Sequence, residues 1–148
     1  MKRLLIAFTL LAILAPLSFA GVQDFDEFSI DVATGWTAKR IDENAVEILE
    51  NNNYALIMIT TVQYKGMTFK DAAKQSMKEL KGRNLKKEAD NMYSFQYRLK
   101  GNVDVGCFII PMKSQKGRYA LLGIAVSDNA LKKTDNEIQA MLDSFRTY

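Results

Sequence analysis

The sequence contains no histidine, and its 148 residues include one cysteine, one tryptophan and two prolines. Without histidine the chain cannot build a His-dependent catalytic triad or a histidine-containing zinc or copper site. It also lacks the side chain that normally titrates near neutral pH. The single Cys107 cannot form an internal disulfide, and no histidine is present to activate its thiol, so we expect this residue to be buried and inert. These absences exclude several common forms of nucleophilic and metal-dependent catalysis.

The first twenty residues have the layout of a secretory signal peptide. Two basic residues precede an apolar run at 4–17, and Ser18 and Ala20 place small side chains at a cleavage site. The run is too short to be read first as a membrane span, and no cysteine follows it that could carry a lipid. We therefore expect cleavage after Ala20 and a mature chain, residues 21–148, that folds as a single domain. The expected location is periplasmic or secreted, with no membrane-spanning segment.

The charges of the expected mature chain are unevenly distributed, although its 18 basic and 17 acidic residues almost balance. Residues 21–64 carry eight acidic and two basic side chains, whereas residues 65–118 carry thirteen basic and five acidic ones. Segregation of this kind affects surface fields and partner choice rather than the fold.

Alternating apolar residues and turn signals predict a series of strands. Residues 22–27 are acidic and predict only a frayed approach to the first strand, Phe28–Val32. A Thr-Gly turn follows, and Trp36 then begins a short extended segment. Residues 54–62 are apolar or β-branched on both faces, which predicts a central strand. The other expected strands are Ala45–Glu50, Leu85–Ala89, Met92–Leu99, Val103–Pro111 and Tyr119–Ser127.

Two segments have helical periodicity. The first runs over residues 69–81, with Thr68 as N-cap, Asp71 in a capping-box position and Gly82 at the C-terminal end. The second begins near Thr134 and has an apolar stripe at residues 138, 141, 142 and 145. Short turns between successive strands predict antiparallel pairing as a meander. The expected fold class is therefore α+β, with helices packed on the faces of an antiparallel sheet.

The segment FSIDVATGW, residues 28–36, resembles the opening of PsbP-like proteins, and residues 138–145, IQAMLDSF, resemble the last helix of that family. Ala33 stands where the family often has proline. The family includes extrinsic photosystem proteins, a Ran-binding import factor and bacterial envelope proteins. The resemblance implies an αβα sandwich used as a binding or assembly module, and the matched motifs contain no catalytic residue.

A lysine stripe is the main candidate for a functional surface. Lys70, Lys74, Lys78 and Lys81 recur at helical spacing on one side of the first helix, and Lys86 and Lys87 follow it. This surface could bind an acidic protein or an anionic envelope surface, or it could be a solvated face. Nucleic acid is disfavoured by the expected export and by the absence of interleaved arginine and aromatic residues.

Other residues have simpler interpretations. Trp36 is expected to be a structural anchor that closes one end of the core. The acids at positions 24, 26 and 27 lack the spacing of a calcium loop, which favours a solvated N-terminus. In the strand at 92–99, aromatic residues occupy one face and Met92 belongs to an opposite face expected to be solvent-exposed. A ligand groove, if present, is expected at the boundary between these faces.

The sequence thus predicts an exported, non-enzymatic binding or assembly module without cofactor or metal. Two alternatives stay open. One is a small-ligand or lipid carrier, which requires an apolar cavity between sheet and helix. The other is an enzyme that uses carboxylate or lysine chemistry in a cleft, for which Asp42, Glu43, Glu47 and Glu50 are candidate acids.

Overall fold

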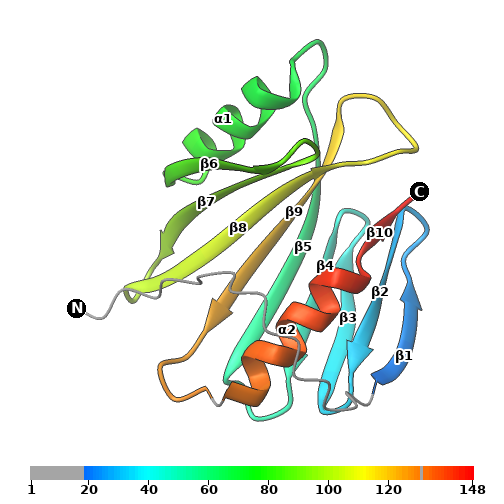
Figure 1. Ribbon diagram of the computed structural model, residues 1–148, viewed down its shortest axis with the longest axis vertical. Helices are drawn as coiled ribbons and strands as arrows, with labels where there is room; N and C mark the ends of the chain where they lie inside the picture. The colour runs from blue at the N-terminus through cyan, green and yellow to red at the C-terminus, as the bar shows by residue number, and fades with distance from the viewer. Residues whose placement is uncertain (1–18, 131) are drawn as a thin grey trace.

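Two antiparallel sheets and two helices make up residues 19–130 and 132–148, the part of the chain that the computed structural model describes (Figure 1). The large sheet has the strand order β3-β4-β5-β9-β8-β7-β6, and the small sheet has the order β1-β2-β10. The elements are β1 (Phe19–Asp24), β2 (Phe28–Ala33), β3 (Trp36–Asp42), β4 (Ala45–Glu50), β5 (Ala55–Gln63), α1 (Phe69–Glu79), β6 (Arg83–Ala89), β7 (Met92–Leu99), β8 (Val103–Pro111), β9 (Arg118–Val126), α2 (Lys132–Ser144) and β10 (Arg146–Thr147). The α+β class with antiparallel strands is confirmed.

The large sheet consists of two meanders joined at its centre. Strands β3, β4 and β5 pair in chain order, as do β6, β7, β8 and β9, and β5 then pairs with β9 along its whole length, from Ala55↔Val126 to Gln63↔Arg118. The central position predicted for β5 is therefore confirmed. Its alternating burial reflects the face of the sheet to which each side chain points.

The two helices cover opposite faces of the large sheet and opposite ends of it. Helix α1 packs on the β6–β7 end, where Ala72 and Ala73 join a cluster with Phe95, Cys107 and Leu121. Helix α2 and the small sheet pack on the other face; the members of that core include Ile48, Ile57, Ile59, Leu122, Ile138 and Met141. Figure 1 shows this diagonal arrangement, with α1 beside β6 and β7 and α2 near β2 and β10. Each face consequently has one part that no helix covers.

The expected frayed approach at residues 22–27 is wrong in its first half, because β1 pairs with β2 from Phe19↔Ala33 to Asp24↔Ser29. The alternation typical of a strand is missing here because Val22, Gln23 and Asp24 are all exposed, Val22 to 68%. The apolar run of the expected signal peptide lies in residues 1–18, outside the described residues. Cleavage after Ala20 stays a prediction.

Helix α1 begins as expected and ends differently. The Asp71 amide donates to Thr68 Oγ1 at 3.2 Å, and the Thr68 hydroxyl donates to the Asp71 carboxylate at 2.7 Å. At the other end the left-handed residue is Lys81, with φ of 52°, rather than Gly82. The amide of Lys81 donates to the Lys78 carbonyl at 3.1 Å and that of Gly82 donates to the Met77 carbonyl at 2.7 Å, as in a Schellman motif.

Gly82 is required for space rather than for its backbone angle. A Cβ at this position would lie 2.9 Å from both the Gln96 carbonyl oxygen and Phe95 Cδ2, and 3.0 Å from Met77 Cγ. The absence of a side chain lets the chain leave α1 in close contact with β7. The sequence located the end of the helix correctly to within two residues, but for the wrong physical reason.

Lys81→Gly is expected to raise the free energy of unfolding by about 0.5–1 kcal/mol, because glycine adopts the left-handed conformation without the steric cost of a Cβ. Lys78→Gly, inside the helix, serves as control and is expected to lower it by about 1 kcal/mol. Urea unfolding followed by circular dichroism measures both. A Lys81→Gly variant no more stable than the parent would contradict the assignment of strain to this residue.

Candidate binding surfaces

The four lysines of the stripe are all exposed. Three of them lie on α1, but the placement of Lys81 on the helix is wrong, because the helix ends at Glu79 and Lys81 has a left-handed backbone. Lys74 has an acidic neighbour, since its Nζ lies 3.7 Å from the Asp71 carboxylate. Within the described part of the chain, no ion pair involves Lys70, Lys78 or Lys81. The helix therefore presents a positive surface whose charge is only partly compensated by the protein itself.

The two lysines of β6 do not extend this surface together. Lys87 pairs with Tyr93, which packs edge-on against Phe69 of α1, whereas Lys86 pairs with Ser94 and points to the opposite face of the sheet. Both are already bound to acids, Lys86 to Glu88 at 3.0 Å and Lys87 to Asp90 at 2.7 Å. The hydrogen bond from Lys87 and its charge hold the pKa of Asp90 below its usual value. Partner binding by the six lysines stays a prediction, but they do not form one continuous surface.

Trp36 is almost completely buried, with 5% of its surface exposed, in the core between β3 and α2. Its indole N–H donates to the Glu137 carboxylate of α2 at 2.8 Å. Glu137 is itself buried, and Lys133 lies 3.5 Å from its other oxygen. This placement supports the role expected for Trp36 as a structural anchor.

Glu27 takes part in a polar cluster that no local sequence pattern indicates, because its partners are remote in the chain. Arg118 Nε lies 2.7 Å from Glu27 Oε1, and its Nη2 donates to Glu27, Asn44 and Thr61 at 2.8, 3.2 and 3.0 Å. These contacts join the β1–β2 turn to the large sheet. The expectation of a solvated acidic N-terminus is therefore wrong for Glu27.

Two of the other candidate acids, Asp42 and Glu50, accept hydrogen bonds within turns. Asp42 accepts a hydrogen bond from the Asn44 amide at 2.7 Å, and Glu50 accepts one from the Asn52 amide at 2.8 Å. Among residues 19–130 and 132–148, no group of three Cys, Asp or Glu side chains could hold a metal ion. Neither α1 nor α2, the helices of those residues, is long and apolar enough to cross a membrane.

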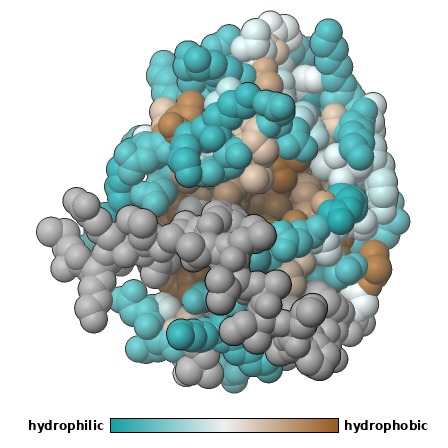
Figure 2. Space-filling model, viewed as in Figure 1, coloured by the Kyte–Doolittle hydropathy of each residue, from teal (hydrophilic) through white to brown (hydrophobic). Residues whose placement is uncertain are grey.

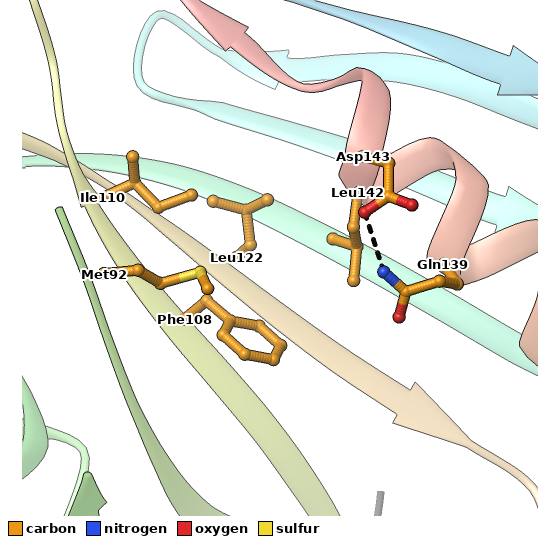
Figure 3. Close-up of a pocket in the computed structure, with 7 residues that line it drawn as sticks. All are labelled: Met92, Phe108, Ile110, Leu122, Gln139, Leu142 and Asp143. Atoms are coloured by element: carbon orange, nitrogen blue, oxygen red, sulfur yellow. Dashed lines mark hydrogen bonds between the residues drawn. The ribbon is translucent and has the colours of Figure 1, made fainter. Parts of the chain in front are cut away.

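One pocket lies between α2 and the strands β7, β8 and β9, with a volume of about 110 Å³. Figure 3 shows apolar side chains from the strands facing Leu142 of α2, and a hydrogen bond of 2.8 Å between Gln139 and Asp143 at the rim. Its lining residues are Met92, Phe108, Ile110, Leu122, Gln139, Leu142 and Asp143. We call this the α2 pocket. In the same orientation as Figure 1, Figure 2 shows apolar atoms in a recess surrounded by hydrophilic ones.

A second pocket, of about 210 Å³, lies on the opposite face between the C-terminal half of α1 and the strands β5, β9, β8 and β7. Its lining residues are Met58, Thr60, Val62, Ser76, Glu79, Leu80, Tyr97, Cys107, Leu121 and Gly123. We call this the α1 pocket. Cys107 forms part of its floor and is 2% exposed, and burial raises the pKa of the thiol to about 12. The expectation of a buried thiol is confirmed.

In place of the single groove expected at the boundary between the faces of β7, the structure has two separate pockets, one on each face. Each face of that strand contributes to a different pocket, Met92 to the α2 pocket and Tyr97 to the α1 pocket. Met92, expected to face solvent, is half-buried. The apolar cavity between sheet and helix that a ligand carrier requires is present in both places, on a small scale.

Several solved structures share this fold. Cyanobacterial PsbP (CyanoP) from Synechocystis sp. PCC 6803 is 13% identical, with a TM-score of 0.58 over 93% of this chain and 99% of that one. The Ran-binding protein Mog1p of Saccharomyces cerevisiae is 10% identical, with a TM-score of 0.55 over 82% and 90% of the two chains. A Bacteroides thetaiotaomicron protein is 12% identical, with a TM-score of 0.59 over 89% of this chain and 49% of its own, so this chain spans about half its length.

No family model matches the sequence, and no curated protein matches it. At identities of 10–13% the structural likeness establishes the fold alone, and no residue role is carried over from these proteins. The PsbP-like fold expected from residues 28–36 and 138–145 is confirmed.

Proposed function

We propose that this PsbP-like domain is an exported, non-enzymatic binding or assembly module that docks an acidic protein partner through the exposed face of α1. The observation that carries the proposal is the stripe of Lys70, Lys74, Lys78 and Lys81, three of which have no ion pair in the described residues. Helix α1 has 11 residues and so extends over about 16 Å. That length suits one contact patch of a protein interface.

The helix is preformed, which favours docking. Its N-terminus is capped by Thr68, its C-terminus by the Schellman motif, and its inner face is fixed by buried Ala72 and Ala73. A rigid positive surface steers an acidic partner toward it and requires little ordering when the partner binds. Because lysine is a flexible point charge, we expect such docking to be sensitive to salt.

Two further considerations support the proposal. Mog1p, one of the proteins of the same fold, is by its name a Ran-binding protein, so this fold can present a surface to another protein. The leader-like residues 1–20 support export to the periplasm or out of the cell, where such a partner would be met. Fractionation of cells with an antibody against the domain tests the location, and N-terminal sequencing of the exported form tests cleavage after Ala20.

Charge reversal of Lys70, Lys74 and Lys78 to glutamate is expected to weaken capture of the partner at least tenfold, with little change in stability because all three side chains are exposed. Pull-down from envelope extract, followed by titration of the captured protein at two salt concentrations, measures the effect. The matched control reverses Lys100, Lys113 and Lys116, which are equally exposed, have no ion pair in the described chain and lie outside α1.

The control is expected to retain the partner, since its net charge changes by the same amount at a different place. Capture of the same proteins by the α1 variant would show the proposal to be wrong. Vesicles containing anionic lipid provide the second arm: a parent protein that binds these vesicles through α1 and captures no protein would also overturn it.

A further inference from the structure

The α1 pocket is separate from the lysine stripe, although both involve the same helix. Ser76, Glu79 and Leu80 face the pocket, at positions that share one side of the helix. Lys70, Lys74 and Lys78 occupy the other side, and Lys81 follows the end of the helix. A ligand in the pocket would therefore not depend on the surface proposed for docking.

The most informative group in the pocket is the hydroxyl of Tyr97. It lies over the backbone of Gly123, 3.0 Å from the position that a Cβ there would take, with Val105 Cγ1 3.5 Å from that position. The φ of Gly123 is not in the left-handed region, so glycine is needed here for space and not for its backbone angle. Within the described chain the hydroxyl has no hydrogen-bond partner, and the side chain lines the pocket.

Burial raises the pKa of Tyr97, with a smaller contribution from Cys107. The phenol is therefore protonated at neutral pH and available as a donor. The Tyr97 hydroxyl is not among the fully buried polar atoms without a partner, so water reaches it in the free protein and a ligand acceptor can take the place of that water. Two further hydroxyls line the pocket, those of Thr60 on β5 and Ser76 on α1. Ser76 is already engaged, since it donates to the Tyr64 hydroxyl at 3.2 Å.

The charge of the wall restricts the kind of ligand. Glu79 accepts a hydrogen bond from Tyr64 at 2.6 Å and one from Gln75 at 2.7 Å. These hydrogen bonds, with that from Tyr64 the larger cause, lower the pKa of Glu79. The carboxylate is thus ionised at neutral pH and disfavours an anion at this wall.

We propose that the α1 pocket is a binding site for a small, neutral, largely apolar molecule that presents a hydrogen-bond acceptor to the Tyr97 hydroxyl. The apolar walls are formed by Met58, Val62, Leu80 and Leu121. A dry cavity of about 150 Å³ lined by aliphatic and aromatic side chains binds benzene. The 210 Å³ of this pocket accommodates one six-membered ring with a short substituent.

Acetophenone is a suitable probe, because it combines one ring with one carbonyl acceptor. Methyl and amide NMR of the purified protein is expected to show saturable shifts at Met58, Leu121 and Cys107 during titration. Met92, in the α2 pocket on the other face, serves as internal control and is expected not to shift. Ethylbenzene, which lacks the acceptor, is expected to bind about fivefold more weakly, the effect of one hydrogen bond. Benzoate, which is anionic, is expected to bind more weakly than either.

Tyr97→Phe removes only the hydroxyl and leaves the ring in place. We expect it to weaken acetophenone binding about fivefold and to leave ethylbenzene binding unchanged. Tyr93→Phe is the matched control, because Tyr93 occupies the same face of β7 but packs against Phe69 rather than lining the pocket. It is expected to bind both probes as the parent does.

Three results would overturn the site: shifts at Met92 equal to those at Met58, unchanged acetophenone binding by Tyr97→Phe, or tighter binding of benzoate than of acetophenone. The lysine-reversed variant provides an independent arm. It is expected to bind acetophenone like the parent, so loss of partner docking and loss of the pocket ligand can be told apart.

Discussion

Trp36→Ala is expected to lower the free energy of unfolding by about 3–5 kcal/mol, as for other buried large-to-small substitutions. The side chain is 5% exposed and contributes to a core built from β2, β3, β4, β5, β8, β9 and α2. Its removal leaves a cavity at the start of β3 and also removes the donor to Glu137. Both effects act on the contact between α2 and the large sheet.

A second variant separates the two effects. Trp36→Phe keeps most of the buried area but loses the N–H donor, so the buried Glu137 carboxylate retains only the contact with Lys133 at 3.5 Å. We expect a loss of about 1–3 kcal/mol from the unsatisfied carboxylate. In the background of Glu137→Gln this loss is expected to be smaller, because a neutral amide is less costly to leave without a partner.

Trp36 is the protein's single tryptophan, so its variants have no tryptophan fluorescence by which unfolding could be followed. Urea unfolding is therefore followed by circular dichroism. A melting curve of Trp36→Ala close to that of the parent would contradict the structural role. The residue would then return to the list of candidate binding residues.

The parts of the fold that could be predicted from sequence are those governed by local patterns. The run of apolar and β-branched residues in β5 indicated burial on both faces, and Thr68 and Asp71 marked the start of α1. The apolar stripe predicted part of the inner face of α2, since Ile138 and Met141 are buried there, while Phe145 is buried just after the helix ends. In each case the information lies within about ten residues of chain.

What could not be predicted depends on contacts between distant segments. Strand β1 is stabilised by pairing with β2 while its successive residues Val22, Gln23 and Asp24 stay exposed, so its sequence has no alternating apolar pattern and resembles that of a loop. Arg118 and Glu27 are 91 positions apart, and no local pattern links them. The α1 pocket combines residues of four strands and one helix, whose relative register is set only by folding.

The placement of Lys86 and Lys87 is a different case, because the signal was present. Once residues 85–89 are assigned to a strand, neighbouring side chains point to opposite faces. The grouping of the two lysines with the stripe on α1 rests on their closeness to the helix in the sequence, and closeness in sequence does not determine which face of a strand a side chain occupies. The period of two within β6 indicates that only Lys87 shares the face on which α1 lies.

Phe95→Ala is the other substitution with a large expected effect, again about 3–5 kcal/mol. Phe95 is 1% exposed and lies in the core between α1 and the sheet, with Ala72, Ala73 and Cys107 in the same cluster. The loss is expected to loosen α1 selectively. Hydrogen exchange should show reduced protection in α1 and β6, with β2 and α2 unaffected, because the latter belong to the other core.

A substitution at Gly82 tests whether the end of α1 is held by its contact with Phe95. Gly82→Ala alone is expected to cost about 1–3 kcal/mol, since its Cβ would lie 2.9 Å from Phe95 Cδ2 and from the Gln96 carbonyl. In the Phe95→Ala background the contact with the ring is gone, and those with the Gln96 carbonyl oxygen and Met77 Cγ remain. The double variant is therefore expected to be more stable than the sum of the single changes predicts, by about 1 kcal/mol.

Combining Gly82→Ala with Trp36→Ala is the matched control for that cycle. The two residues contact separate cores on opposite faces of the large sheet, so their effects are expected to add within about 0.5 kcal/mol. Additivity of Gly82→Ala with Phe95→Ala, measured by urea unfolding, would show that the contact at the end of α1 is not the source of the cost. Coupling to Phe95 without coupling to Trp36 would mean that α1, which carries both the lysine stripe and a wall of the pocket, is held by its own core.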